Sequence, residues 1–172
     1  MGHSLRIFAP NLCDMTARER QFMETAIDLA RKGMNSNMGG PFGCIVVKDE
    51  KIIGRGCNSV LAHNDPTAHA EVVAIRDACT HLKTFQLKDC EIYTSCEPCP
   101  MCMGAIYWAR PSKVFFAATR NDAAAAGFDD SLIYKELTTP IDDRLIEMIN
   151  LEREKSIELF REWINKPDKV DY

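Results

Sequence analysis

The sequence predicts a three-layer α/β domain, with helices on both faces of a mixed β-sheet. Three observations lead to this prediction. Short β-rich runs alternate along the chain with segments whose apolar residues recur at helical spacing. Loops that contain glycine, proline or asparagine separate several of these segments. The length of 172 residues is enough for one domain with a buried core.

The N-terminal part of the pattern is a helix followed by a hairpin. The helix is predicted over Thr16–Lys32, because Glu19 follows Thr16 at the spacing of a capping box and the apolar residues fall on one helical face. Two short apolar runs, Cys44–Val47 and Ile52–Gly56, flank a charged turn. That arrangement is typical of a β-hairpin.

Helices and strands then alternate. A turn at His63–Pro66 leads into a helix at Thr67–Leu82, and Pro100 suits the first turn of a helix that ends near Arg110. Beyond Pro140 the pattern changes, so this region is expected to be a separate arm. The other predicted elements are strands at Cys90–Ser95, Lys113–Ala118 and Ile146–Leu151, helices at Asp122–Gly127 and Lys155–Asn165, and a tail from Pro167 to Tyr172.

Composition and charge exclude several classes of protein. Hydrophobic residues make up 46% and charged residues 27%, which argues against disorder. No apolar run approaches the roughly 18 residues of a membrane span, and MGHSLRIFAP lacks the apolar stretch of a secretory signal, so we expect a cytoplasmic protein. The formal net charge of −4 disfavours nucleic acid as a partner and favours a small substrate.

Two motifs, each at the start of a predicted helix, indicate a zinc site. Cys99 and Cys102 lie one helical turn apart, so both thiolates can bind one ion, and His69 can supply a third ligand. With three protein ligands the fourth position stays open to water, whose pKa zinc lowers to about 7. Glu71 lies two residues from His69 and is the expected proton carrier.

Other interpretations of the same residues are open. The Cys99–Cys102 pair is a candidate redox motif, although that leaves His69 and Glu71 without a purpose. Cys96 is a candidate fourth ligand, which would close the site and make the zinc structural. A zinc-stabilised interaction module without enzymatic activity is the alternative from another functional class.

The two motifs together, HAE and PCPMC, resemble the signature of the cytidine deaminase-like superfamily of zinc-dependent deaminases. GGPFG at residues 39–43, DPTAHAEV from Asp65, YTSCEPCPMCMGAIYWAR from Tyr93 and AGFDDS from Ala126 are similar to its bacterial guanine deaminase branch. The resemblance implies a five-stranded mixed sheet. It also implies a homodimer of single-domain subunits (residues 1–172) in which the arm, residues 140–172, swaps onto the partner.

The resemblance also implies roles for individual residues. His69, Cys99 and Cys102 would hold Zn²⁺, and Glu71 would carry the proton. The remaining expected contacts are Asn58 with the base edge, Phe42 with the ring, Asp130 with the substrate amino group and in proton transfer, Tyr172 closing the pocket and Trp108 lining it. Each has a structural alternative: a turn for Asn58, the core for Phe42, a helix cap for Asp130, and packing for Trp108.

The implied reaction is hydrolysis of guanine to xanthine and ammonia, in purine catabolism or salvage. Guanosine is the nearest alternative substrate, and Tyr172 would decide how much room is left for a sugar. A tRNA adenosine deaminase acting on a flipped-out base is a further alternative, which the acidic net charge disfavours. Cytosine or a nucleotide completes the set of candidate substrates.

Overall fold

The computed structural model describes residues 15–171. These residues form two compact units, which divide between Thr119 and Arg120. Each unit is described by itself. Two predictions concern residues outside this range. They are the role of Tyr172 in closing the pocket and the lack of a secretory signal in the N-terminal segment. No helix among residues 15–171 combines the length and the apolar character needed to cross a membrane.

The first unit contains the predicted alternation of helices and strands. Its helices and strands, in chain order, are α1 (Ala17–Asn35), β1 (Gly43–Lys48), β2 (Lys51–Cys57), α2 (Val60–His63), α3 (Ala70–Leu82), β3 (Glu91–Cys96), α4 (Pro100–Ala109) and β4 (Lys113–Ala118). Pro100 occupies the first turn of α4, as predicted. The short helix α2 was not predicted.

The strands form one mixed sheet in the order β2-β1-β3-β4. β1 pairs antiparallel with both β2 and β3, while β3 and β4 run parallel because helix α4 connects them. The sheet of the described residues therefore has four strands. This corrects the expectation of five, whereas the α/β class and the mixed character of the sheet are confirmed.

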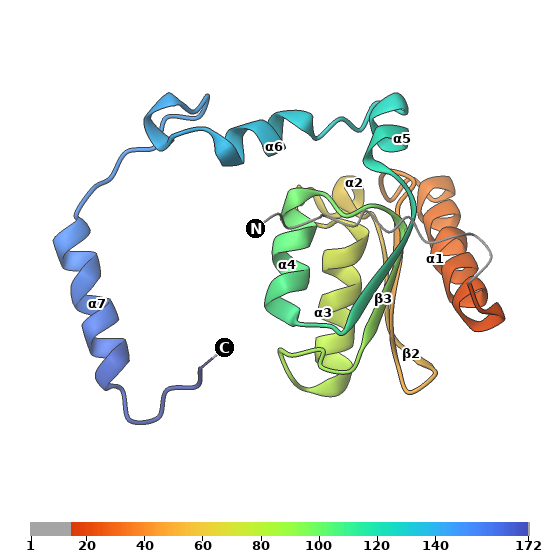
Figure 1. Ribbon diagram of the computed structural model, residues 1–172, viewed down its shortest axis with the longest axis horizontal. Coiled ribbons are helices and arrows are strands. Elements are labelled where there is room, and N and C mark those ends of the chain that lie inside the picture. Colours follow the sequence, from red (N-terminus) through yellow and green to blue (C-terminus); the bar gives the residue numbers. More distant parts are fainter. Residues whose placement is uncertain (1–14, 172) are drawn as a thin grey trace, which may run out of the picture. The chain divides into compact units, whose positions relative to one another are not determined.

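Helices cover both faces of the sheet, as Figure 1 shows for α1 on one side and α3 and α4 on the other. On the α1 face, Ala26 packs with Ile45, Val47 and Tyr93. On the opposite face, side chains of α3 and α4 pack with apolar residues of β1 and β3. Glycine in β2 lets α3 approach closely, because a Cβ on Gly56 would lie 2.2 Å from the Ala70 carbonyl oxygen.

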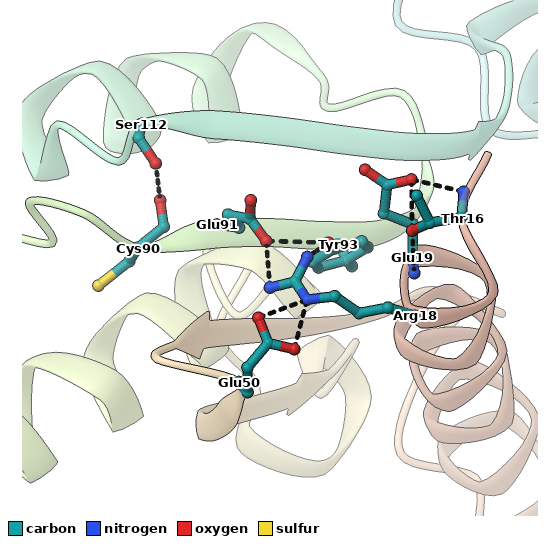
Figure 2. A network of polar contacts seen from close by, with 8 residues as sticks. All are labelled: Thr16, Arg18, Glu19, Glu50, Cys90, Glu91, Tyr93 and Ser112. Atoms are coloured by element: carbon teal, nitrogen blue, oxygen red, sulfur yellow. Dashed lines mark hydrogen bonds and ion pairs between the residues drawn. The ribbon is translucent and has the colours of Figure 1, made fainter. Parts of the chain in front are cut away.

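Helix α1 begins with the predicted capping box and is tied to the sheet by a polar network (Figure 2). The Arg18 guanidinium forms ion pairs with Glu50 at 2.6 Å and with Glu91 at 2.8 Å. It also donates to the Tyr93 hydroxyl at 3.1 Å. Arg18 therefore joins α1 to the hairpin turn and to β3.

The second unit contains the helices α5 (Arg120–Ala125), α6 (Ser131–Thr138) and α7 (Arg153–Asn165), and the 3₁₀ turn η1 (Ile141–Asp143). Helix α7 confirms the predicted C-terminal helix, and α6 was not predicted. The strand expected at Ile146–Leu151 is wrong, because this segment has no strand structure. A strand needs a neighbour for its backbone hydrogen bonds, and residues 120–171 contain no other strand.

Candidate metal centre

The predicted zinc ligands come together at the start of two neighbouring helices. His69 is the N-cap residue of α3, and Cys99 is the N-cap residue of α4. Neither side chain makes a capping hydrogen bond, so both are available to a ligand. Cys102 lies in the first turn of α4 and is fully buried. The ligand set is therefore built from two helix N-termini, where the helix dipoles favour thiolates.

The distances between the ligand atoms fit one tetrahedral zinc ion. His69 Nδ1 lies 3.5 Å from Cys99 Sγ and 3.5 Å from Cys102 Sγ. A nitrogen and a sulfur bound to the same tetrahedral zinc, at about 2.0 Å and 2.3 Å, are about 3.5 Å apart. Three ligand atoms within 4.8 Å of one another, one imidazole nitrogen and two sulfurs, thus match both the spacing and the donor types of a zinc site.

Ionisation within the cluster also favours a cation. A hydrogen bond from Cys102 is the main cause that lowers the pKa of the Cys99 thiol to about 4, and His69 lowers it further. The hydrogen bond with Cys99 raises the pKa of His69. The hydrogen bond between the two thiols raises the pKa of Cys102, since only one of them ionises easily without a metal. A cation bound by the three residues would take the place of the retained proton and stabilise both thiolates.

Glu71 lies beside the ligands in the first turn of α3. Its side chain is buried, at 6% exposure, and Cys102 Sγ donates to its Oε2 at 3.3 Å. Burial is the main cause that raises the pKa of this carboxyl group. A carboxyl group that is buried next to a metal ligand but is not part of the ligand cluster has the placement expected of a proton carrier.

The alternative of a closed zinc site, in which Cys96 is the fourth ligand, is wrong. The Cys96 thiol donates to the Thr119 carbonyl oxygen at 3.6 Å, and Cys96 is not among the clustered ligand atoms. Within residues 15–171 the only cluster of potential metal ligands is the one formed by His69, Cys99 and Cys102. A three-ligand set leaves a coordination position for water, which a catalytic zinc requires.

Two of the predicted substrate contacts, Phe42 and Asn58, lie side by side in the first unit, just before β1 and just after β2. Asn58 is buried at 6% exposure, and its Oδ1 accepts from the backbone N–H groups of Gly40 and Val60 at 3.2 and 3.3 Å. Neither hydrogen bond uses the side-chain amide nitrogen. The backbone N–H of Asn58 donates to the backbone carbonyl of Phe42 at 2.9 Å. The partly buried side chain of Phe42 packs against the core.

Two further predicted contacts, Trp108 and Asp130, lie in different units of the chain. Trp108 on α4 is 63% exposed, so the buried packing position considered for it is wrong. Asp130 is the N-cap residue of α6, in the second unit, and makes no side-chain capping hydrogen bond. The described residues therefore bring together His69, Glu71, Cys99 and Cys102.

One polar neighbour of the site was missed by the sequence analysis. Thr94 on β3 is 1% exposed and donates through Oγ1 to Glu71 Oε1 at 3.3 Å. Strand alternation was a usable signal, because Thr94 lies on the same face as Ile92, which packs against α3 and α4. A hydroxyl group on a core-facing position requires a buried hydrogen-bond partner.

Comparison with known proteins agrees with this geometry. Residues 16–118 match the family model of the cytidine and deoxycytidylate deaminase zinc-binding region. The chain is 54% identical to guanine deaminase of Bacillus subtilis over 151 residues, which cover 88% of this chain and 97% of that protein. The crystal structure of Bacillus subtilis guanine deaminase has a TM-score of 0.87 and 52% identity, covering 92% and 99% of the two chains.

A tRNA-specific adenosine deaminase of Buchnera aphidicola is also similar, at 40% identity over 105 residues, which cover 61% of this chain and 69% of that protein. This similarity is shorter and lower than the one to the guanine deaminase. The residues matched by the family model, 16–118, include the metal cluster. The chain therefore belongs to the family of hydrolytic enzymes defined by the cytidine and deoxycytidylate deaminase zinc-binding region.

Proposed function

We propose that this protein is a zinc-dependent guanine deaminase that converts guanine and water to xanthine and ammonia. The observation that carries the proposal is a three-ligand metal cluster with the buried carboxyl of Glu71 beside it. The redox interpretation of Cys99 and Cys102 does not account for His69 and Glu71. Similarity to a guanine deaminase along nearly its whole length supports guanine over other aminated rings.

The residues divide the chemistry between them. His69, Cys99 and Cys102 would hold the zinc, which when bound would supply Lewis acidity and lower the pKa of water. The bond that forms in the reaction is the one between the water oxygen and C2 of the ring. Glu71 accepts the proton of the attacking water and delivers it to the ring nitrogen. It then takes the proton of the new hydroxyl group on C2 and delivers it to the amino group, which leaves as ammonia while the C2 carbonyl forms. Burial suits Glu71 to this cycle, because its raised pKa makes the carboxyl group both a base and an acid.

Substrate contacts complete the proposal. The Asn58 oxygen is held by two backbone N–H groups, so its amide nitrogen is free to be aimed at an acceptor on the edge of the base. Phe42 would pack on the ring, and exposed Trp108 would line the pocket entrance. Asp130 would bind the amino group that leaves and assist its protonation. Tyr172 would close the pocket and exclude a ribose.

We further propose that the enzyme is a cytoplasmic homodimer of single-domain subunits, whose arm, residues 140–172, exchanges with the partner. The apolar face of α7 supports this proposal. Leu159, Phe160 and Ile164 are 63%, 66% and 65% exposed, and no residue described between 120 and 171 is buried. A helix with such a face needs a covering surface. Its role would be in purine catabolism or salvage, without a nucleic acid or membrane partner.

Ammonia release from a panel of substrates tests the proposed activity. Zinc-loaded protein is offered guanine, guanosine, adenine, cytosine and tRNA at equal concentration, and metal-free protein is the control. We expect guanine to be turned over fastest by at least about 100-fold, which corresponds to about 2.7 kcal/mol of transition-state discrimination. Faster deamination of any other substrate refutes guanine, and release from none, with unfolding on chelation, supports a zinc-stabilised module.

A further inference from the structure

The buried hydroxyl of Thr94 contacts the carboxyl oxygen of Glu71 that is not hydrogen-bonded to Cys102. Thr94 Oγ1 donates to Glu71 Oε1 at 3.3 Å, whereas Glu71 Oε2 lies 3.3 Å from Cys102 Sγ. The two carboxylate oxygens are thus distinguished, one held by strand β3 and the other facing a metal ligand. The Thr94 contact is longer than the usual hydroxyl hydrogen bond of about 2.7 Å, as catalytic contacts without a substrate often are.

The direction of the Thr94 side chain is fixed from the other face of the sheet. Successive side chains of a strand point to opposite faces, so the orientation of Tyr93 determines that of Thr94. Tyr93 stacks on Phe115 with ring centroids 4.5 Å apart. Its hydroxyl donates to Glu91 and accepts from Arg18, as Figure 2 shows. With Tyr93 anchored on the α1 face, Thr94 is directed at α3.

We propose that Thr94 is a positioning residue that holds Oε1 of Glu71 and thereby keeps Oε2 toward the metal. Glu71 is attached to α3 by a flexible side chain, and its carboxyl group accepts a hydrogen bond from its own backbone N–H. The side chains that fix which oxygen faces the metal ligands are Thr94 and Cys102. The metal ligands cannot hold the carboxyl group in the loaded site, because Cys102 as a thiolate has no proton to donate. Only the expected effect of Thr94 on the rate rests on the proposed function, because it requires that Glu71 carries the proton.

The Thr94→Val and Thr94→Ser variants test this role. Valine keeps the shape and strand preference of threonine but removes the hydroxyl, while serine keeps the hydroxyl. We expect Thr94→Val to lower kcat about 10-fold to 100-fold, as loss of an outer partner of a metal site does. KM should stay within about threefold, because the hydroxyl orients the proton carrier and leaves uniform binding of the substrate intact. Thr94→Ser should recover kcat to within about threefold of the wild type.

Crystal structures of the zinc-loaded wild type and Thr94→Val protein give a readout that does not depend on activity. The proposal predicts one carboxylate orientation for Glu71 in the wild type and a rotated or split one in Thr94→Val, with equal zinc content. An unchanged Glu71 orientation, or a kcat for Thr94→Val within twofold of the wild type, overturns it. If the wild type releases no ammonia from guanine, the proposed function fails, while the Glu71 orientation still decides the role of Thr94.

Discussion

Substituting Gly56 by alanine should disable the metal centre, because Gly56 lies in β2 directly against the backbone of helix α3. A Cβ at this position would lie 2.2 Å from the Ala70 carbonyl oxygen and 2.6 Å from the Ala74 backbone nitrogen. Both atoms belong to the helix backbone and cannot rotate away, so α3 has to move. Reaching an ordinary contact of about 3.5 Å requires these two atoms to move away by about 1.3 Å and about 0.9 Å. Ala70 directly follows His69, so the shift displaces the histidine ligand and Glu71 relative to Cys99 and Cys102.

The expected loss can be estimated from the size of this shift. Overpacking of a core contact costs about 1–3 kcal/mol of unfolding free energy, and a misplacement of about 1 Å in an active site lowers the rate about 100-fold. Chemical denaturation, zinc content and ammonia release measured on the same preparation separate these effects. Gly104→Ala on α4 is the matched control, because a Cβ there would meet no atom within 4 Å beyond its chain neighbours and the backbone of its own helix. Wild-type stability and turnover in Gly56→Ala would refute the reasoning.

Three further outcomes are expected. Cys99→Ser should lower the affinity for zinc by more than the about 10-fold to 100-fold that follows loss of a residue hydrogen-bonded to a ligand. Cys79→Ala is the control and should retain its zinc. Elemental analysis after dialysis measures the zinc content of both variants. Thr16→Ala should cost about 1 kcal/mol of unfolding free energy at neutral pH. Hydrogen bonds from Thr16 lower the pKa of Glu19, so this stabilisation is present above the usual glutamate pKa and is lost as the pH falls through the lowered one. Equal losses at neutral and strongly acidic pH would contradict it. Arg18→Met should lower the free energy of unfolding by more than the about 0–1 kcal/mol of a typical surface ion pair, because Arg18 bridges two carboxylates. A denaturant titration that finds no loss of stability would contradict this prediction.

Local patterns in the sequence were sufficient to predict the metal centre. Cys99 and Cys102 are three residues apart, a spacing that places both side chains on one side of a helix, and Glu71 follows His69 by two residues at the start of the other helix. What brings the two motifs to one point is the packing of α3 and α4 on the same sheet face. The sequence implied that packing only through the alternation of helices and strands.

The exact start of α3 was not predictable from helical periodicity. The helix was expected from Thr67 but begins at Ala70. The Asp65 carboxylate accepts from the Thr67 backbone N–H at 2.8 Å and from its hydroxyl at 2.7 Å, which forms a turn ahead of the helix. This turn leaves His69 at the N-cap, where its ring is free of the helix surface and available to a metal.

The segment Ile146–Leu151 shows the opposite case, in which an apolar pattern led to a wrong prediction. A short segment rich in apolar residues is compatible with a strand, but whether a strand forms depends on a neighbour that supplies backbone hydrogen bonds. Ile146, Ile149 and Leu151 are 80%, 74% and 81% exposed. A pattern within six residues cannot report on a partner that lies elsewhere in the chain or in another subunit.

The most direct test of the account is the Glu71→Gln variant, assayed for zinc and for ammonia release from guanine on the same sample. Glutamine keeps the size of the side chain and its acceptor for Thr94 but cannot carry a proton. We predict the zinc content of the wild type together with a kcat lowered by about 100-fold to 10,000-fold, the range contributed by a positioned acid–base group. Wild-type zinc content with near-normal turnover would contradict the assignment of Glu71 and, with it, the hydrolytic mechanism built on this site.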